Sequence, residues 1–385
     1  MNQITDNHER LKQLLKEFLA VKGYKYHYKT NSATRRNSTV VDRGLLLSEF
    51  RMYGLKHGHS ELKGFFPDIL RIWKMAEAQR YLEQLRQSLS FKNQNDLIEK
   101  WCMAVTGENN PITIAVTKHF LWQVKRKLHG MSVDHHMLLC LFGPSGAGKS
   151  VAIHKLLDPV SQFKMDSDFS ILQDKFIGKT FERNFVLFMD EMGGAKNCDV
   201  DRLKNIITAP FIESRAMRSE EIQSVKNNTT LIAASNNEIR ELIKDPTSSR
   251  RYFQIDSQEV INWELINSID YLSLWQSVDH EAVSPITSLL KEIRVIQESK
   301  IRVKCPIEQF LEECVAVSPF SKNSPNTNQV YSSFVSFMDL QGIKIYPTLQ
   351  EFSKSIVSKG AKLGMSIENR RTRRGTCWPF KLGPT

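Results

Sequence analysis

The chain has 385 residues, of which 41% are hydrophobic and 25% charged. This length allows two or three domains, and this apolar share suffices for globular cores, so a wholly disordered chain is excluded. The net charge of +11 and the isoelectric point near 9.3 suit a polyanionic partner, although basic proteins without such a partner exist.

Cysteine usage and hydropathy indicate the compartment. The six cysteines are scattered without a Cys-x-x-Cys pair, so neither a zinc site nor a disulfide framework is predicted. No apolar run approaches the roughly 20 residues that a bilayer requires, and the first ten residues are polar. We therefore expect a cytoplasmic protein without a signal peptide and without a membrane partner.

The N-terminal third is predicted to be mainly helical. One stripe of apolar side chains has the spacing of a helix face and is assigned to the core: Leu11, Leu14, Leu15, Phe18 and Leu19. Residues 23–29 alternate aromatic and basic side chains, which would suit a strand that stacks bases and holds phosphates, although a half-exposed edge strand is the commoner explanation of such alternation. Residues 101–136 follow as a helical lead-in, interrupted by a polar turn at 107–111.

A phosphate-binding loop follows an apolar strand at residues 137–142, and a helix is expected after it at residues 151–157. Small residues let consecutive N–H groups wrap a phosphate, a lysine neutralises the β- and γ-phosphates, and a serine hydroxyl binds magnesium. The flanking strand and helix disfavour a chance glycine-rich turn. The predicted site for a nucleoside triphosphate comprises Gly143, Pro144, Ser145, Gly146, Ala147, Gly148, Lys149 and Ser150.

Two further apolar strands end in polar residues. Residues 185–189 lead into Asp190 and Glu191, the kind of pair that holds magnesium and polarises water in phosphate-loop ATPases. Residues 229–234 lead into Ser-Asn-Asn, and because open α/β sheets bind ligands at the carboxyl ends of their strands, Asn236 could reach the γ-phosphate. An ordinary strand end and an ordinary turn are the alternatives.

Paired arginines precede the next apolar stretch, residues 252–255. Arg250 or Arg251 could enter a neighbouring subunit's site as a finger that stabilises charge on the transferring phosphoryl group. An isolated pair would otherwise be a solvated charge run, and the sequence does not decide which arginine would act.

These four elements, in this order, resemble the superfamily 3 helicase domain, a branch of the AAA+ ATPases in replication proteins of small DNA viruses, phages, plasmids and satellites. The resemblance spans residues 101–257. It implies ATP and Mg²⁺ as ligands and a homo-oligomeric ring, usually of six subunits, with a collar at the lead-in. It assigns catalysis to Lys149, Asp190, Glu191, Asn236 and Arg250 or Arg251, with Ser150 and Asp190 as magnesium ligands.

The same family carries a hairpin between the acidic pair and the sensor strand, which projects into the pore and grips nucleic acid. Here the corresponding stretch is residues 210–226. Arg215, Arg218 and Lys226 are therefore candidates for contacts with backbone phosphates. The acidic residues among them fit a plain exposed hairpin as well.

The C-terminal part is predicted as a small basic domain. Residues 318–328 read as a linker, and residues 330–338 and 348–357 as two helices, the second with a capping threonine and a glutamate at its third position. The pattern looks like the winged-helix domain that follows the ATPase in phage and poxvirus primase-helicases. A charge run is usually a solvated face, but on a wing it favours duplex or forked DNA through Arg370, Arg371, Arg373 and Arg374.

The predicted fold class is α/β: an AAA+ type P-loop ATPase core with a mainly helical N-terminal domain and a C-terminal winged-helix-like domain. The expected divisions are the N-terminal domain (1–100), the collar or lead-in (101–136), the core with following helices (137–300), a helix and linker (301–328) and the basic domain (329–385). No Asp-x-Asp pair precedes residue 137, so the primase part of some relatives is not expected here.

The predicted function is that of an ATP-dependent DNA helicase in the replication of a phage, plasmid or other mobile element, moving on single-stranded and forked DNA. A separate primase or loader is a further partner that the resemblance allows. The alternative is an ATP-dependent initiator that assembles on an origin and melts DNA without processive unwinding. A regulatory ATPase that binds no nucleic acid, and a role on RNA, also stay open.

Overall fold

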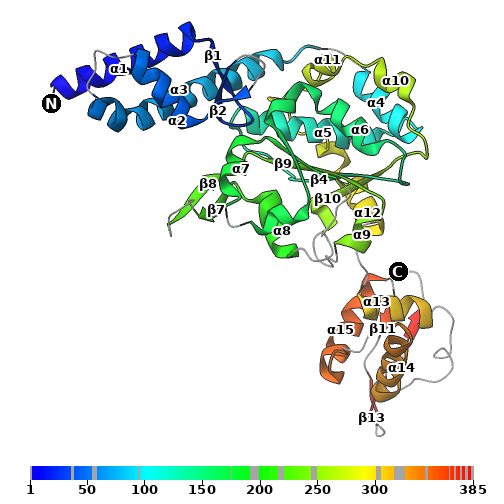
Figure 1. The fold of residues 1–385 in the computed structure, drawn as a ribbon. Helices are drawn as coiled ribbons and strands as arrows, with labels where there is room; N and C mark the ends of the chain where they lie inside the picture. The colour runs from blue at the N-terminus through cyan, green and yellow to red at the C-terminus, as the bar shows by residue number, and fades with distance from the viewer. Residues whose placement is uncertain are drawn as a thin grey trace. The chain divides into compact units, whose positions relative to one another are not determined.

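The computed structural model describes residues 2–35, 39–53, 59–93, 96–174, 176–190, 199–215, 221–243, 249–300, 305–315, 326–342, 346–363, 365–367, 370–372, 375–377 and 380–382. The chain divides into two compact units. The first comprises Met1–Lys244 and Ser249–Ile301, and the second comprises Asp245–Ser248 and Arg302–Thr385. Figure 1 shows the elements of both units.

The N-terminal region is mainly helical, as expected, and carries a small antiparallel sheet of order β1-β2-β3. Its elements are α1 (Asn2–Val21), β1 (Tyr24–His27), β2 (Ser32–Arg35), β3 (Thr39–Val40), α2 (Arg43–Tyr53) and α3 (His59–Ser88). The apolar stripe of α1 lies in the core, with Leu15 and Phe18 fully buried. This packing confirms the helix-face assignment.

The alternating segment at residues 23–29 forms β1, but its aromatic side chains are not available to bases. Tyr24, Tyr26 and Tyr28 are only 3 to 6% exposed. The ring of Tyr28 packs 4.3 Å from that of Phe163, and burial raises the pKa of Tyr28 to about 12. The base-stacking interpretation is therefore wrong for the folded chain, because these tyrosines are buried: Tyr24 and Tyr26 pack within the N-terminal region, and Tyr28 packs against the rest of its unit.

The helical lead-in consists of α4 (Leu97–Thr106) and α5 (Pro111–Leu128), separated by the predicted polar turn. The side chain of Asn110 caps α5 by accepting hydrogen bonds from the N–H groups of Ile112 and Thr113. Pro111 occupies the first helical position, where no N–H is needed. Both features explain why the second helix begins where it does.

The centre of the first unit is a parallel sheet of five strands in the order β10-β4-β9-β6-β5. Their bounds are β4 (Leu138–Phe142), β5 (Lys164–Ser167), β6 (Val186–Met189), β9 (Thr230–Ser235) and β10 (Tyr252–Asp256). Strands that are buried on both faces read as continuous apolar runs. This explains the unbroken hydrophobic stretches in the sequence and confirms the α/β class.

Alternate residues of each strand enter two different cores. Leu139 and Leu141 of β4 belong to the core that includes α5 and α6 (Lys149–Leu156), whereas Leu138 and Cys140 belong to the other core. The second core is closed by α7 (Gly178–Arg183), α8 (Val200–Thr208) and α9 (Ile239–Leu242). Helices therefore cover both faces of the sheet (Figure 1).

The remaining elements of the first unit follow or interrupt the sheet. They are the antiparallel hairpin β7 (Phe211–Arg215) and β8 (Ile222–Lys226), and the helices α10 (Trp263–Asn267), α11 (Tyr271–Gln276) and α12 (Leu290–Lys300). The hairpin contacts α7 through Ser214, whose Oγ accepts a 3.0 Å hydrogen bond from the N–H of Gly178. A hairpin at residues 210–226 is thereby confirmed.

The second unit has three helices followed by short strands: α13 (Pro306–Phe310), α14 (Thr327–Leu340), α15 (Leu349–Lys362), β11 (Met365–Ile367), β12 (Arg370–Thr372), β13 (Gly375–Cys377) and β14 (Phe380–Leu382). Thr348 and Glu351 form the predicted capping box of α15. Phe310, Phe334 and Phe352 form its fully buried aromatic core. In the described part of the whole chain, no helix has the length and apolar character needed to cross a membrane.

Candidate active site

The predicted loop, acid and sensor residues meet at the carboxyl edge of the sheet. β9 lies between β4 and β6, and the strands end together, with Phe142 opposite Ser235 and Met189 opposite Ala233. The segments that follow these strands surround a cavity of about 320 Å³. The cavity is lined by Ser145, Gly146, Gly148, Lys149, Ser150, Val151, Asp190, Ala234, Ser235 and Asn236.

Lys149 lies at the base of this cavity and is only 6% exposed. Its Nζ donates hydrogen bonds to the carbonyl oxygens of Gly143 and Pro144, at 2.9 and 2.7 Å, and to Oδ1 of Asn236 at 2.8 Å. A buried ammonium must be surrounded by oxygen acceptors, because an unpaired buried charge is costly. Lys149 and Asn236, which are 87 residues apart, are therefore in direct contact.

The two predicted magnesium ligands are also in contact. Oγ of Ser150 donates a 2.6 Å hydrogen bond to Oδ1 of Asp190, and the Asp190 side chain is exposed to the cavity. Two adjacent ligands of an octahedral Mg²⁺ with bonds of 2.0 to 2.1 Å lie about 2.9 Å apart. A small separation of these oxygens would thus suffice for both to bind one magnesium ion.

The shape of the loop depends on Trp263, which sequence reasoning missed. Gly148 has φ +95°, and a Cβ built on it would lie 2.2 Å from Cζ2 of Trp263. Gly146 has φ +80°, but no atom lies within 4 Å of a Cβ built there. Both positions favour glycine for the left-handed backbone, but only Gly148 also requires it for packing.

We expect Gly148→Ala to lower the free energy of unfolding by about 1 to 3 kcal/mol more than Gly146→Ala does, because only the first substitution forces a methyl group into the indole ring. The two variants share the cost of a non-glycine residue at positive φ, so the comparison isolates the contact with Trp263. Urea denaturation of the two proteins measures the difference. Equal midpoints and slopes would show that Trp263 does not support the loop.

The two candidate finger residues lie at the amino ends of the parallel strands, opposite the phosphate loop. Arg250 and Arg251 form the short turn η4 (Ser249–Arg251), which directly precedes β10. Because β10 runs parallel to β4, with Tyr252 opposite Leu138 and Asp256 opposite Phe142, the turn is at the amino end of the sheet. The sheet length between this edge and the phosphate loop is about 13 Å. The structure therefore does not bring these arginines to their own chain's cavity.

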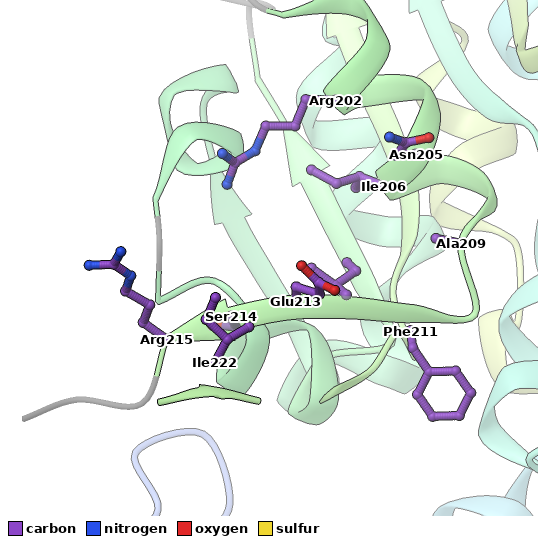
Figure 2. Close-up of a pocket in the computed structure, with 10 residues that line it drawn as sticks. Arg202, Asn205, Ile206, Ala209, Phe211, Glu213, Ser214, Arg215 and Ile222 are labelled. Carbon is purple, nitrogen blue, oxygen red and sulfur yellow. The ribbon is translucent and has the colours of Figure 1, made fainter. Parts of the chain in front are cut away.

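The hairpin presents a mixed surface to solvent. Along its exposed face, Phe211 pairs with Lys226 and Arg215 pairs with Ile222. Phe211 and Ile222 are 57% and 63% exposed, which is unusual for large apolar side chains. A cavity of about 480 Å³ lies between β7 and α8, and Figure 2 shows Arg202 and Arg215 at one side of it with Phe211 at the opposite end of β7. This cavity does not include any residue of the phosphate loop.

Several predicted residues cannot be placed. Glu191, Arg218, Arg373 and Arg374 lie outside the described residues. Arg370 and Arg371 lie in β12, which pairs with β13. Their roles, like those of the placed residues, stay predictions.

Sequence reasoning also missed Gln297, a buried residue of α12 that contacts the arginine turn. The signals available in the sequence were weak. Trp263 begins a short helix after β10, and Gln297 is a polar residue next to Ile293 and Ile296 on α12. Neither pattern by itself points to the loop or to the arginines.

Comparisons with known proteins indicate which family the chain belongs to. No curated protein matches the sequence. Among solved structures, the apo C-terminal region of NrS-1 is similar at 13% identity, with a TM-score of 0.49 over 77% of this chain and 78% of that one. The A form of the same region gives 13% identity and a TM-score of 0.47 over 76% of each chain.

The sequence also matches a model of a protein family. The model described as the virulence-associated protein E-like domain covers residues 82–281, which is just over half of the 385 residues. The match includes the end of α3, the lead-in helices, the whole parallel sheet and the cavity at its carboxyl edge. The chain belongs to the family of proteins with a virulence-associated protein E-like domain.

Proposed function

We propose that this protein binds ATP and Mg²⁺ in the cavity at the carboxyl edge of the sheet and hydrolyses the nucleotide. The observation that carries the proposal is the convergence of Lys149, Ser150, Asp190 and Asn236 from three adjacent strands on one cavity. A cation, a hydroxyl, a carboxylate and an amide are the groups that phosphoryl transfer from a magnesium nucleotide requires.

The contacts of Lys149 suggest how the site would respond to nucleotide. The three oxygen partners described above are neutral, whereas the β- and γ-phosphates carry full negative charge. At an effective dielectric constant near 20, two unit charges 4 Å apart attract by about 4 kcal/mol. A triphosphate would therefore compete well for the ammonium and release the amide of Asn236 to bind the γ-phosphate or the attacking water.

The remaining catalytic groups would come from Asp190, Glu191 and a second subunit. Asp190 would bind magnesium with Ser150, and Glu191 would polarise the attacking water. The position of Arg250 and Arg251 at the opposite edge supports action on the nucleotide of a neighbouring copy, because neither arginine can reach its own. This arrangement requires a ring or another head-to-tail assembly.

We further propose that hydrolysis moves the protein along one strand of DNA during the replication of a phage, plasmid or other mobile element, as superfamily 3 helicases do. Support comes from the net charge of +11 and from the exposed Arg215 and Lys226 on the hairpin. Cations of this kind bind phosphates without regard to sequence, as a moving motor needs. The basic segment around Arg370 and Arg371 would contact the duplex ahead of the fork if the second unit is a winged helix.

The experiment that tests this function is ATP-dependent strand displacement on forks tailed only 3′ or only 5′. We expect unwinding of one polarity by the wild-type protein and none by the Lys149→Ala protein, because movement depends on hydrolysis. The direction of the productive tail gives the polarity of movement.

Three other outcomes separate the alternatives. DNA-stimulated hydrolysis without displacement on either fork would favour the origin-binding initiator. Hydrolysis that no polynucleotide changes would favour a regulatory ATPase. Hydrolysis that RNA stimulates and DNA does not would indicate that the substrate is RNA.

A further inference from the structure

The turn that carries Arg250 and Arg251 lines a cavity of about 250 Å³ at the amino edge of the sheet. The rest of the wall comes from α12 and from the segment before β4 and includes Arg294, His135 and His136. Among the described residues, the lining contains three arginines and two histidines and no carboxylate. Burial lowers the pKa of His136 to about 4 and keeps this ring neutral, so the positive charge of the lining comes from the arginines. Guanidinium groups gathered in one cavity repel one another, and an anion between them relieves the repulsion.

The turn is held in place by α12. Gln297 is only 1% exposed, and its Nε2 donates hydrogen bonds to the carbonyl oxygens of Arg250 and Tyr252, at 3.2 and 2.9 Å. The first carbonyl belongs to the peptide unit before Arg251 and the second to the peptide unit after Tyr252, so one amide holds the backbone on both sides of residues 251 and 252. A buried amide is costly unless it is hydrogen-bonded, and here the bonds connect the helix specifically to the arginine turn.

Arg294 lies three residues before Gln297, hence on the same face of α12. Its side chain is exposed and lines the cavity with Arg250 and Arg251. Among the residues that the structure describes, Arg294 forms no ion pair. With respect to the described residues, its exposed guanidinium is available to bind an external anion.

The C-terminal end of α12 contacts the carboxyl end of β10. Nζ of Lys300 and Oδ2 of Asp256 form an ion pair at 2.5 Å, and Asp256 is the last residue of β10. The helix thus contacts both ends of β10, through the buried Gln297 and through a solvent-exposed ion pair that adds little stability. Such a helix can hold Arg294 and the arginine turn in a constant relative position.

We propose that α12 completes the intersubunit half of the ATPase site. Gln297 is a positioning residue that orients the arginine turn, and Arg294 is a further cation that binds the terminal phosphate of the ATP held by the neighbouring subunit. The inference rests on the proposed function, because it needs a nucleotide in the neighbour's cavity.

The first test replaces Gln297 by methionine, which keeps the length of the side chain and removes the donor. We expect kcat for ATP hydrolysis to fall by at least about tenfold while KM changes by less than about twofold, because the variant's own phosphate loop is intact. Mixing this variant with the Lys149→Ala protein should restore activity, since the latter supplies an intact turn to the variant's loop. A defect in the variant's own core would not be restored.

The second test uses Arg294→Ala, which changes an exposed side chain and should leave folding intact. We expect a loss of kcat of about tenfold to a hundredfold, partial recovery in Arg294→Lys, and restoration by Lys149→Ala. Lys291→Ala is the matched control, because Lys291 is an exposed cation of α12 that does not line the cavity. It should keep the wild-type rate.

The outcomes separate this inference from the function on which it rests. If wild type hydrolyses ATP and Lys149→Ala does not, wild-type rates in both α12 variants overturn the inference alone. Slow variants that Lys149→Ala fails to restore overturn it too, because the defect then lies within one subunit. If Lys149→Ala and wild type behave alike, the proposed function fails and the inference fails with it.

Discussion

Replacing Lys149 by alanine is expected to reduce ATP hydrolysis by on the order of 10² to 10³ or more, which is the loss seen when one preorganised charge-stabilising group is removed from an active site. Of the described residues that line the carboxyl-edge cavity, Lys149 is the one cation. Its removal would deprive the β- and γ-phosphates of the ammonium charge and Asn236 of its 2.8 Å partner. Steady-state phosphate release measures the effect.

The matched control for this prediction is Lys155→Ala. Lys155 lies on the same helix, α6, but it is exposed and does not line the cavity. We expect this variant to hydrolyse ATP at the wild-type rate. Hydrolysis near the wild-type rate in Lys149→Ala would contradict the assignment of the loop as the phosphate site.

Mixing two inactive proteins is expected to restore hydrolysis when one lacks the finger and the other lacks the loop. We expect Arg250→Ala or Arg251→Ala to be inactive alone and to recover in an equimolar mixture with Lys149→Ala. Where subunits assort at random in a head-to-tail ring, roughly a quarter of the junctions combine an intact loop with an intact finger. The mixture should therefore approach about one quarter of the wild-type rate.

The structure supplies a matched negative control for this mixing experiment. Asn236 and Lys149 line the same cavity and are in direct contact, so they belong to one subunit's site. A mixture of Asn236→Ala and Lys149→Ala should stay inactive, because no subunit carries both residues in its own cavity. Recovery there, or no recovery with either arginine variant, would remove the support for an intersubunit site.

Local features of the fold could be predicted from the sequence because their signals lie within a few residues. The glycines around Gly146 predicted the loop between a strand and a helix. Thr348 and Glu351 predicted the start of α15, where both hydrogen bonds of the capping box are present. The hairpin of β7 and β8, by contrast, was expected at residues 210–226 from the family resemblance and not from a local signal.

The burial of Tyr26 and the tertiary contacts of Gln297 could not be predicted in this way. The alternation around Tyr26 is compatible with a base-binding strand and with a packed strand, and only the contacts with α3 and the rest of the unit decide between them. Gln297 carries no local signal, because its partners are backbone oxygens 45 and 47 residues earlier in the chain.

What the sequence by itself determined is the set of chemical groups: a loop for phosphates, acids at one strand end, an amide at another and a pair of arginines. Only the tertiary structure decided how they combine. Parallel neighbours are joined by long crossovers, so strand order depends on how helices pack on both faces and not on local sequence. That packing places β9 between β4 and β6, which brings Asn236 to Lys149, and turns Arg250 and Arg251 to the opposite edge.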